Sequence, residues 1–337
     1  MKSCTSRLVG FFLLGLLALP SCNGRKAASD TDATNMLPRA TLLGNFNSDS
    51  AYRYVAEQVN FGPRVPGSAG HRACRDYIIS KLKSFDCDTL IVQDAVVEAY
   101  NGDKLPISNI IASYNKNARR RILLVAHWDT RPWADMSISE ERRNTPVPGA
   151  NDGGSGTAVL LEIARNLGMK SPNVGVDLLF VDAEDYGDSR GFGENEDTWC
   201  LGTQYWVANM TPYTRENMPV YGILLDMVGG IGAVFHYENF SQQYARTITD
   251  KVWSEAERLG HGDRFIQALG GAVTDDHIFL TRAGIPTTDI IESNNVETQS
   301  FPPTWHTLRD NMNNISHRSL QAVGETVLNV VYKEPAY

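Results

Sequence analysis

Hydrophobic and polar residues follow two different periods along the chain, and the change of period marks the expected helices and strands. Apolar residues recur at helical spacing in segments 50–60 and 71–85. Segments 89–100, 109–114 and 122–126 are rich in strand-forming residues, and the last is a continuous apolar run with the length of a buried strand. Because short turns separate these early strands, the pattern predicts an antiparallel part of a sheet.

From residue 122 onward, expected strands alternate with expected helices. The strand-like segments are 174–181, 220–227 and 286–291, and the helix-like segments are 200–208, 241–259 and 316–332. This alternation is typical of βαβ units, in which helices cover a mostly parallel sheet. The pattern therefore predicts an α/β fold with one domain over residues 46–337, built on a mixed, mostly parallel central sheet flanked by helices on both faces.

The stretch 121–167 contains the sharpest transition from apolar to polar residues. Its strand ends at His127 and Asp129, and glycine-rich residues 149–156 place Asp152 just before a segment with helical spacing. Ligands of open α/β sheets bind beyond the carboxyl ends of the strands. We therefore expect His127, Asp129 and Asp152 to lie where the chemistry occurs.

The N-terminus has the pattern of an export signal. Two basic residues precede an apolar run that ends at residue 20, and Leu-Pro-Ser-Cys then fits a bacterial lipobox. We predict a lipoprotein signal peptide over 1–22, with ordinary secretory cleavage as the alternative, and a flexible polar tether over 23–45. The mature protein would be exported and anchored to the bacterial cell envelope, and to its membrane, by a lipid on Cys22.

Composition narrows the range of partners. The net charge of −8 provides no basic patch, which argues against nucleic acid as a partner. Apart from the signal segment, the cysteines are Cys74, Cys87 and Cys200. Export permits one disulfide, with Cys74 and Cys87 nearest in sequence, but buried free thiols explain the same residues equally well. Their spacing resembles no cysteine-based zinc site.

Acids and imidazoles recur where the expected strands end. Glu184 and Asp185 follow segment 174–181, Asp226 follows an apolar run, Asp275 precedes a short apolar helix, and His306 lies in a later loop. A single such residue is usually a hydrogen-bonding group, whereas several at the same edge of a sheet indicate a site. Carboxylates with imidazoles and no cysteine suit a catalytic Zn²⁺ that has three protein ligands and one open position.

Residues from about 50 to 332 resemble the zinc-dependent exopeptidase family of aminopeptidases and its animal-type glutaminyl cyclase branch. The motifs that carry the resemblance are AHWD, GANDGGSG, the Glu-Asp pair at 184–185, LLDMVG, DDHIFLTRAGIP and WHTLRDN. The resemblance implies Asp152, Asp185 and His306 as metal ligands and Glu184 as the general acid/base. His127 and Asp226 match residues that bind a second zinc in the aminopeptidases.

Trp305 and Asp275 favour the cyclase branch within this resemblance. Trp305 directly precedes His306, as in cyclases, where the indole walls a narrow pocket, although core packing is a simpler role for it. Asp275 could join Asp226 and Glu184 in a group of carboxyls that share protons. Trp199 offers a second indole for substrate binding. The chain departs from the family at Asp185, where most members have glutamate, and at Asp289, where the animal enzymes have histidine.

These observations predict a glutaminyl-peptide cyclotransferase that uses one Zn²⁺ per chain. It would convert N-terminal glutamine of peptides or proteins to pyroglutamate, with Glu184, Asp226 and Asp275 as its catalytic residues. The alternative is an aminopeptidase with two zinc ions, in which Glu184 activates a bridging water. A third hypothesis, a lipid-anchored binding protein without catalytic activity, is disfavoured because every ligand and base position is intact.

Overall fold

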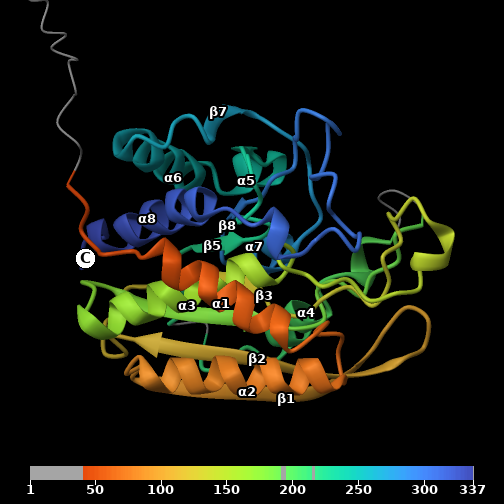
Figure 1. The fold of residues 1–337 in the computed structure, drawn as a ribbon. Helices are drawn as coiled ribbons and strands as arrows, with labels where there is room; N and C mark the ends of the chain where they lie inside the picture. The colour runs from red at the N-terminus through yellow and green to blue at the C-terminus, as the bar shows by residue number, and fades with distance from the viewer. Residues whose placement is uncertain (1–40, 191–194, 215–216, 337) are drawn as a thin grey trace, which may run out of the picture. The chain divides into compact units, whose positions relative to one another are not determined.

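A six-stranded sheet with strand order β1-β2-β4-β3-β5-β8 runs through the described part of the chain (Figure 1). The computed structural model describes residues 41–190, 195–214 and 217–336. The predicted signal peptide, its Cys22 and most of the predicted tether lie outside these residues. The predicted α/β class, with a mixed, mostly parallel sheet, is confirmed.

Strand pairing follows the predicted division into an antiparallel and a parallel part. The strands β1 (Thr89–Glu98), β2 (Lys104–Tyr114) and β4 (Gly175–Val181) pair antiparallel in that order. The strands β3 (Arg121–His127), β5 (Gly222–Leu225) and β8 (Thr287–Ile290) continue the sheet from β4 in parallel. Parallel pairing aligns His127 with Val181 and brings the ends of these strands to one edge.

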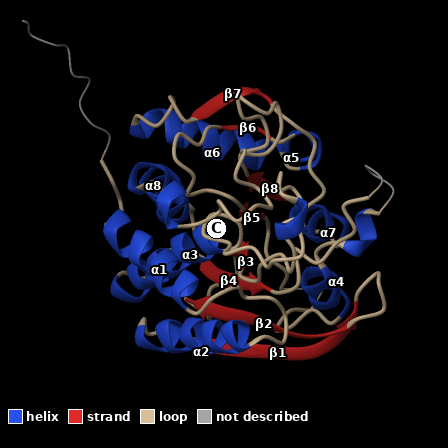
Figure 2. Cartoon of the chain, turned by 45° about the vertical axis from the view of Figure 1, so that its right-hand side comes forward, coloured by secondary structure: helices blue, strands red, loops and turns tan. Residues whose placement is uncertain are grey.

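Alternate residues of the central strands face two separate cores, which explains why these strands are apolar throughout. Leu124 and Ala126 pack into a large core with helices α1 (Ser48–Asn60), α2 (Ala69–Ser84), α3 (Gly154–Met169), α6 (Arg246–Leu259) and α8 (His317–Lys333). Leu123 and Val125 face a smaller core with α4 (Leu201–Ala208) and α7 (Asp276–Arg282). Figure 2 shows the two groups of helices on opposite sides of the strands.

The region after β5 differs from its prediction. The single helix expected over 241–259 is two helices, α5 (Asn239–Tyr244) and α6, because Ala245, with φ −131° and ψ 27°, is not helical and ends the first one. Glu238 caps α5 through the backbone N–H groups of Phe240 and Ser241. Two short strands that the pattern did not predict, β6 (Phe235–Tyr237) and β7 (Phe265–Leu269), pair parallel outside the main sheet.

The predictions about the cysteines and about the tether can also be compared with the structure. Cys74, Cys87 and Cys200 are free thiols, so the structure has no disulfide between Cys74 and Cys87. Within the range expected to be a tether, the backbone N–H groups of Leu43 and Asn45 donate to side chains of α8 and α3. No helix of the described residues is both long and apolar enough to cross a membrane.

Candidate active site

The predicted site residues converge at the edge where the parallel strands end. His127 is the last residue of β3, Asp226 directly follows β5, and Asp185 comes four residues after β4. A cavity of about 330 Å³ opens there. Its lining contains every residue predicted for the first metal, catalysis and substrate binding: Asp152, Glu184, Asp185, Trp199, Asp226, Asp275, Trp305 and His306.

Asp152, Asp185 and His306 form one buried cluster, each offering a ligand atom within 4.8 Å of the others. The His306 Nε2 lies 3.0 Å from the Asp185 Oδ1 and 3.8 Å from the Asp152 Oδ2. Two carboxylates and one imidazole fit Zn²⁺, and three protein ligands leave a position for substrate. The shorter Asp185 therefore reaches the position that the resemblance assigned to it.

A glycine allows the loop before α3 to bring Asp152 to this edge. Gly153 has a left-handed φ of 83°, and a Cβ there would lie 2.3 Å from the Asp129 carbonyl oxygen. Asp310 supports the same loop, because its carboxylate accepts hydrogen bonds from the backbone N–H of Asn151 and Asp152. Burial raises the pKa of Asp310 to about 7. Its role was not predicted, although it lies within the WHTLRDN motif.

Arg131 and Asp135 contact two of the proposed ligands, Asp185 and His306. The Arg131 Nη1 lies 3.4 Å from the Asp185 Oδ1, and its Nη2 donates to Asp135 at 2.6 Å. The Asp135 Oδ1 in turn lies 3.3 Å from the His306 Nδ1. Burial alone would raise the pKa of Asp135, but His306 and Arg131 hold it well below its usual range. A carboxylate on the second ring nitrogen orients a ligating histidine.

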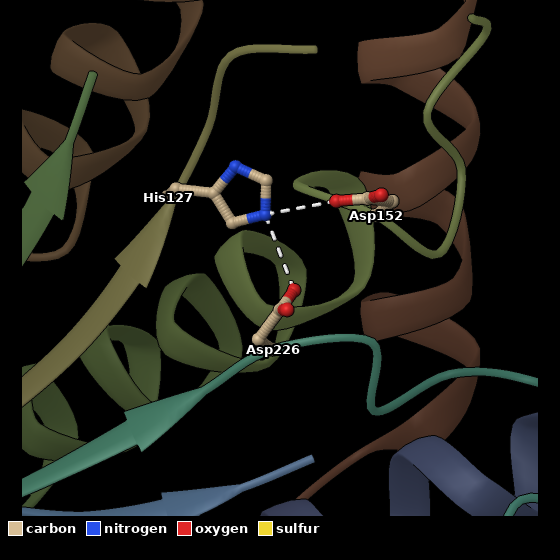
Figure 3. A group of neighbouring side chains, drawn as sticks. All are labelled: His127, Asp152 and Asp226. Carbon is tan, nitrogen blue, oxygen red and sulfur yellow. Dashed lines mark hydrogen bonds and ion pairs between the residues drawn. The ribbon is translucent and has the colours of Figure 1, made fainter. Parts of the chain in front are cut away.

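His127, Asp152 and Asp226 form a second cluster that shares Asp152 with the first (Figure 3). The His127 Nε2 lies 3.1 Å from Asp152 and 3.2 Å from Asp226. Its Nδ1 is 3.4 Å from Asp129, which also accepts from the backbone N–H of Glu184. Burial would lower the pKa of His127, but hydrogen bonds to these aspartates raise it well above its ordinary value. The predicted second-site residues are therefore also adjacent.

Glu184 lines the cavity together with the buried carboxyls of Asp226 and Asp275. Burial raises its pKa well above the ordinary value, and the nearby charge of Asp275 raises it further. Burial and Asp226 together raise the pKa of Asp275 to about 7. The thiol of Cys200 donates to the Glu184 Oε1 at 3.4 Å, a contact that the sequence did not indicate. Burial therefore favours the protonated form of Glu184 more than that of an exposed glutamate, which suits a group that holds and moves a proton.

Two indoles flank His306 on the cavity wall. The ring centroid of Trp305 lies 3.7 Å from that of His306, and Trp199 stacks at 6.1 Å. The guanidinium of the buried Arg131 lies 4.8 Å from the Trp199 ring and makes a cation–π contact with it. Trp305 also packs on Met227 and Val273, but it lines the cavity. Trp305 is therefore both a packing residue and part of the cavity wall.

The chain is similar to known proteins over most of its length. The model of peptidase family M28 matches residues 109–331. The glutaminyl-peptide cyclotransferase of Bos taurus is 26% identical over 357 residues, covering 91% of this chain and 91% of that protein.

Solved bacterial structures are more similar. The glutaminyl cyclase of Bacteroides thetaiotaomicron, bound to N-acetylhistamine, is 48% identical with a TM-score of 0.82, covering 86% of this chain and 99% of that one. A Zn-dependent exopeptidase from Parabacteroides distasonis has the same identity, TM-score and coverage. The similarity thus includes proteins named for either of the two reactions expected from the sequence.

Proposed function

Because the chain belongs to peptidase family M28, it is a zinc-dependent enzyme, and we propose that it is a glutaminyl-peptide cyclotransferase with one Zn²⁺ per chain. The observation that carries this proposal is the stacking of Trp305 on His306 beside the buried Glu184. An indole-lined slot next to a proton-holding carboxyl suits a flat amide side chain. The resemblance to the cyclases supports the same reaction.

Asp152, Asp185 and His306 would hold the ion. When bound there, zinc supplies a Lewis acid that polarises the γ-carboxamide oxygen of an N-terminal glutamine. The rest of the chemistry belongs to the protein, which has to hold the glutamine in a ring-closing conformation and move one proton. Trp199 and Trp305 would restrict the side chain to that conformation.

Glu184 would act as the general acid/base. The substrate's neutral α-amine attacks its own γ-carboxamide carbon, so that an N–C bond forms as the bond to the amide nitrogen breaks. Glu184 takes the proton that the attacking amine loses and gives it to the departing nitrogen, which leaves as ammonia. Asp226 and Asp275 would keep that proton near Glu184, because adjacent buried carboxyls do not all ionise. The product is an N-terminal pyroglutamyl peptide.

The experiment that tests this function compares two reactions on the same peptides. Purified protein is incubated with peptides that begin with glutamine, and mass spectrometry measures loss of ammonia against release of a free amino acid. Cyclisation without amino acid release supports the proposal. Release of N-terminal residues without cyclisation would refute it.

A second candidate function, an aminopeptidase with two zinc ions, is favoured by the cluster of His127, Asp152 and Asp226 (Figure 3). Its geometry could hold a second ion that shares Asp152 with the first. In that enzyme Glu184 would activate a water molecule between the ions. Metal analysis separates the candidates: one zinc per chain supports the cyclase, two support the peptidase, and none supports a binding protein.

We also propose that the enzyme works at the bacterial cell envelope, attached through a lipid on Cys22. The support is the lipobox at the end of an apolar N-terminal run. Its substrates would be exported peptides or proteins with N-terminal glutamine. Labelling of cells with a radioactive fatty acid tests the anchor, because the full chain should incorporate label and the Cys22→Ala variant should not.

A further inference from the structure

A second cavity adjoins the catalytic cavity and shares two lining residues with it, Glu196 and Phe240. Its volume is about 430 Å³. The other lining residues come from α5 and α7: Tyr244, His277, Ile278, Thr281 and Arg282. None of them belongs to the two clusters of proposed metal ligands, so the reaction described above leaves this cavity without a role.

Two aromatic rings of α5 form an apolar wall of this cavity. Phe240 and Tyr244 are four residues apart, which places them on one face of the helix. Their ring centroids are 6.4 Å apart and their planes differ by 17°. Ile278 of α7 adds an aliphatic side chain to the lining, and Tyr244 is 57% exposed. Such a wall suits an apolar side chain, which would cover the exposed part of the Tyr244 ring.

Two nitrogen-bearing side chains of the lining, Arg282 and His277, lie close to carboxylates of the protein. The Arg282 Nη2 lies 3.2 Å from the Glu196 Oε2 at the border with the catalytic cavity. The His277 Nε2 lies 3.0 Å from the buried carboxylate of Glu238. A charged ligand would compete with these pairs, whereas an apolar ligand leaves them intact.

The shared lining residues make the two cavities neighbours, as the side chains of consecutive residues in a bound peptide require. Consecutive Cα atoms are about 3.8 Å apart, so a substrate whose first residue fills the catalytic cavity presents its second side chain within one step. We propose that the second cavity binds the side chain of the residue that follows the N-terminal glutamine and selects aromatic and large aliphatic side chains. This inference rests on the proposed cyclase function.

Peptides that differ only at the second position test the proposal. The kcat/KM for cyclisation of Gln-Phe-Ala is compared with that of Gln-Gly-Ala, using the zinc-loaded enzyme. We expect a preference of about 10-fold for phenylalanine, expressed mainly in KM, which is the usual range for filling an apolar pocket. Tyr244→Ala should lower that ratio by at least about 3-fold, because it removes half of the aromatic wall. Phe240→Ala should lower it in the same direction.

The matched control is Leu269→Ala on β7, which removes an apolar side chain of similar exposure, 61%, outside both cavities. The ratio should be unchanged in that variant. Equal kcat/KM values for the two peptides, or a ratio that Tyr244→Ala and Phe240→Ala leave unchanged, would overturn the inference while the cyclase function stands. Failure to cyclise either peptide would instead overturn the function itself.

Discussion

Individual side chains divide into those whose role the sequence reveals and those whose role depends on distant partners. Asp152, Asp185 and His306 follow recognisable motifs, so their convergence in one cluster could be predicted. Arg131 and Asp135 could not be assigned, because their function is to contact Asp185 and His306. These partners lie more than fifty residues away in the chain, and no local pattern encodes such a contact.

Glu184 gives the most direct prediction at this scale. Glu184→Gln keeps the shape of the side chain but cannot accept the proton of the attacking amine. General acid–base catalysis contributes about 10²–10⁴-fold to rates, and we expect kcat to fall within that range. Zinc content, measured by atomic absorption, should be unchanged, which serves as the control for an intact site. A variant with wild-type kcat would remove Glu184 from its proposed role.

Asp135 gives a second prediction, because it touches the proposed ligand His306 without being a ligand itself. Asp135→Asn should weaken zinc binding by about 10–100-fold, the usual effect of losing a carboxylate behind a ligating histidine. Competition with a chromogenic chelator measures the affinity. Asp250→Asn on the surface of α6 is the matched control and should bind zinc as tightly as the wild type.

Helices and strands could be predicted most readily from the sequence where all of their residues are buried, and some were missed where burial varies along the segment. The strands β3 and β4 are buried at every position, so their apolar runs stand out in the sequence. The break between α5 and α6 was missed because Ala245 is a good helix former and no glycine or proline marks the boundary. The strands β6 and β7 each bury only their first residue fully, so neither an apolar run nor an alternating pattern marks them in the sequence.

The contact between α6 and α8 gives a prediction about stability and pH. Glu255 of α6 accepts hydrogen bonds from Arg258 and from Asn329 and Lys333, the latter two on α8. Burial alone would raise its pKa, but these donors lower it from 4.5 to about 2. Because the folded pKa is the lower one, the stabilisation is fully present above pH 4.5 and is lost as the pH falls toward 2.

Glu255→Gln should therefore lower the free energy of unfolding by about 1 kcal/mol at pH 7, as for other hydrogen bonds between a carboxylate and partly exposed cationic groups. The difference from the wild type should shrink as the pH falls below 4.5. Urea unfolding at several pH values measures both effects. Glu257→Gln, an exposed neighbour on the same helix, should change the stability by less than about 0.5 kcal/mol. A difference that stays constant down to pH 3 would contradict this assignment.

At the scale of the whole molecule, the sequence predicted the order of strands and helices and therefore the edge of the sheet where the site forms. The alternation of elements after residue 122 predicts parallel strands, and parallel strands end at a common edge. What the order could not predict is which loops approach each other across that edge. The second cavity illustrates this limit, since its walls come from α5, α7 and the turn η2 (Glu196–Thr198).

Removal of the metal gives a prediction about the thermal stability of the whole protein. A ligand that binds only the folded state stabilises it by about 4 kcal/mol when its concentration is a thousand times Kd. A chelator should therefore lower the Tm of the wild-type protein by several degrees, and added zinc should restore it. His306→Ala, which lacks one proposed ligand, is the control and should melt at the same temperature with or without chelator. Equal responses of the two proteins would refute the assignment of His306.

Asp152, Asp185 and His306 come from separate segments of the chain, and the last of them lies eleven residues before the start of the final helix α8. Any nascent or truncated polypeptide that ends before residue 306 therefore lacks a complete set of ligands. If these three residues are the ligands, the complete metal site cannot form until the chain has been made past residue 306. If the chain is secreted unfolded, it acquires its ion outside the cytoplasm, and the supply of zinc in that compartment sets how much enzyme becomes active.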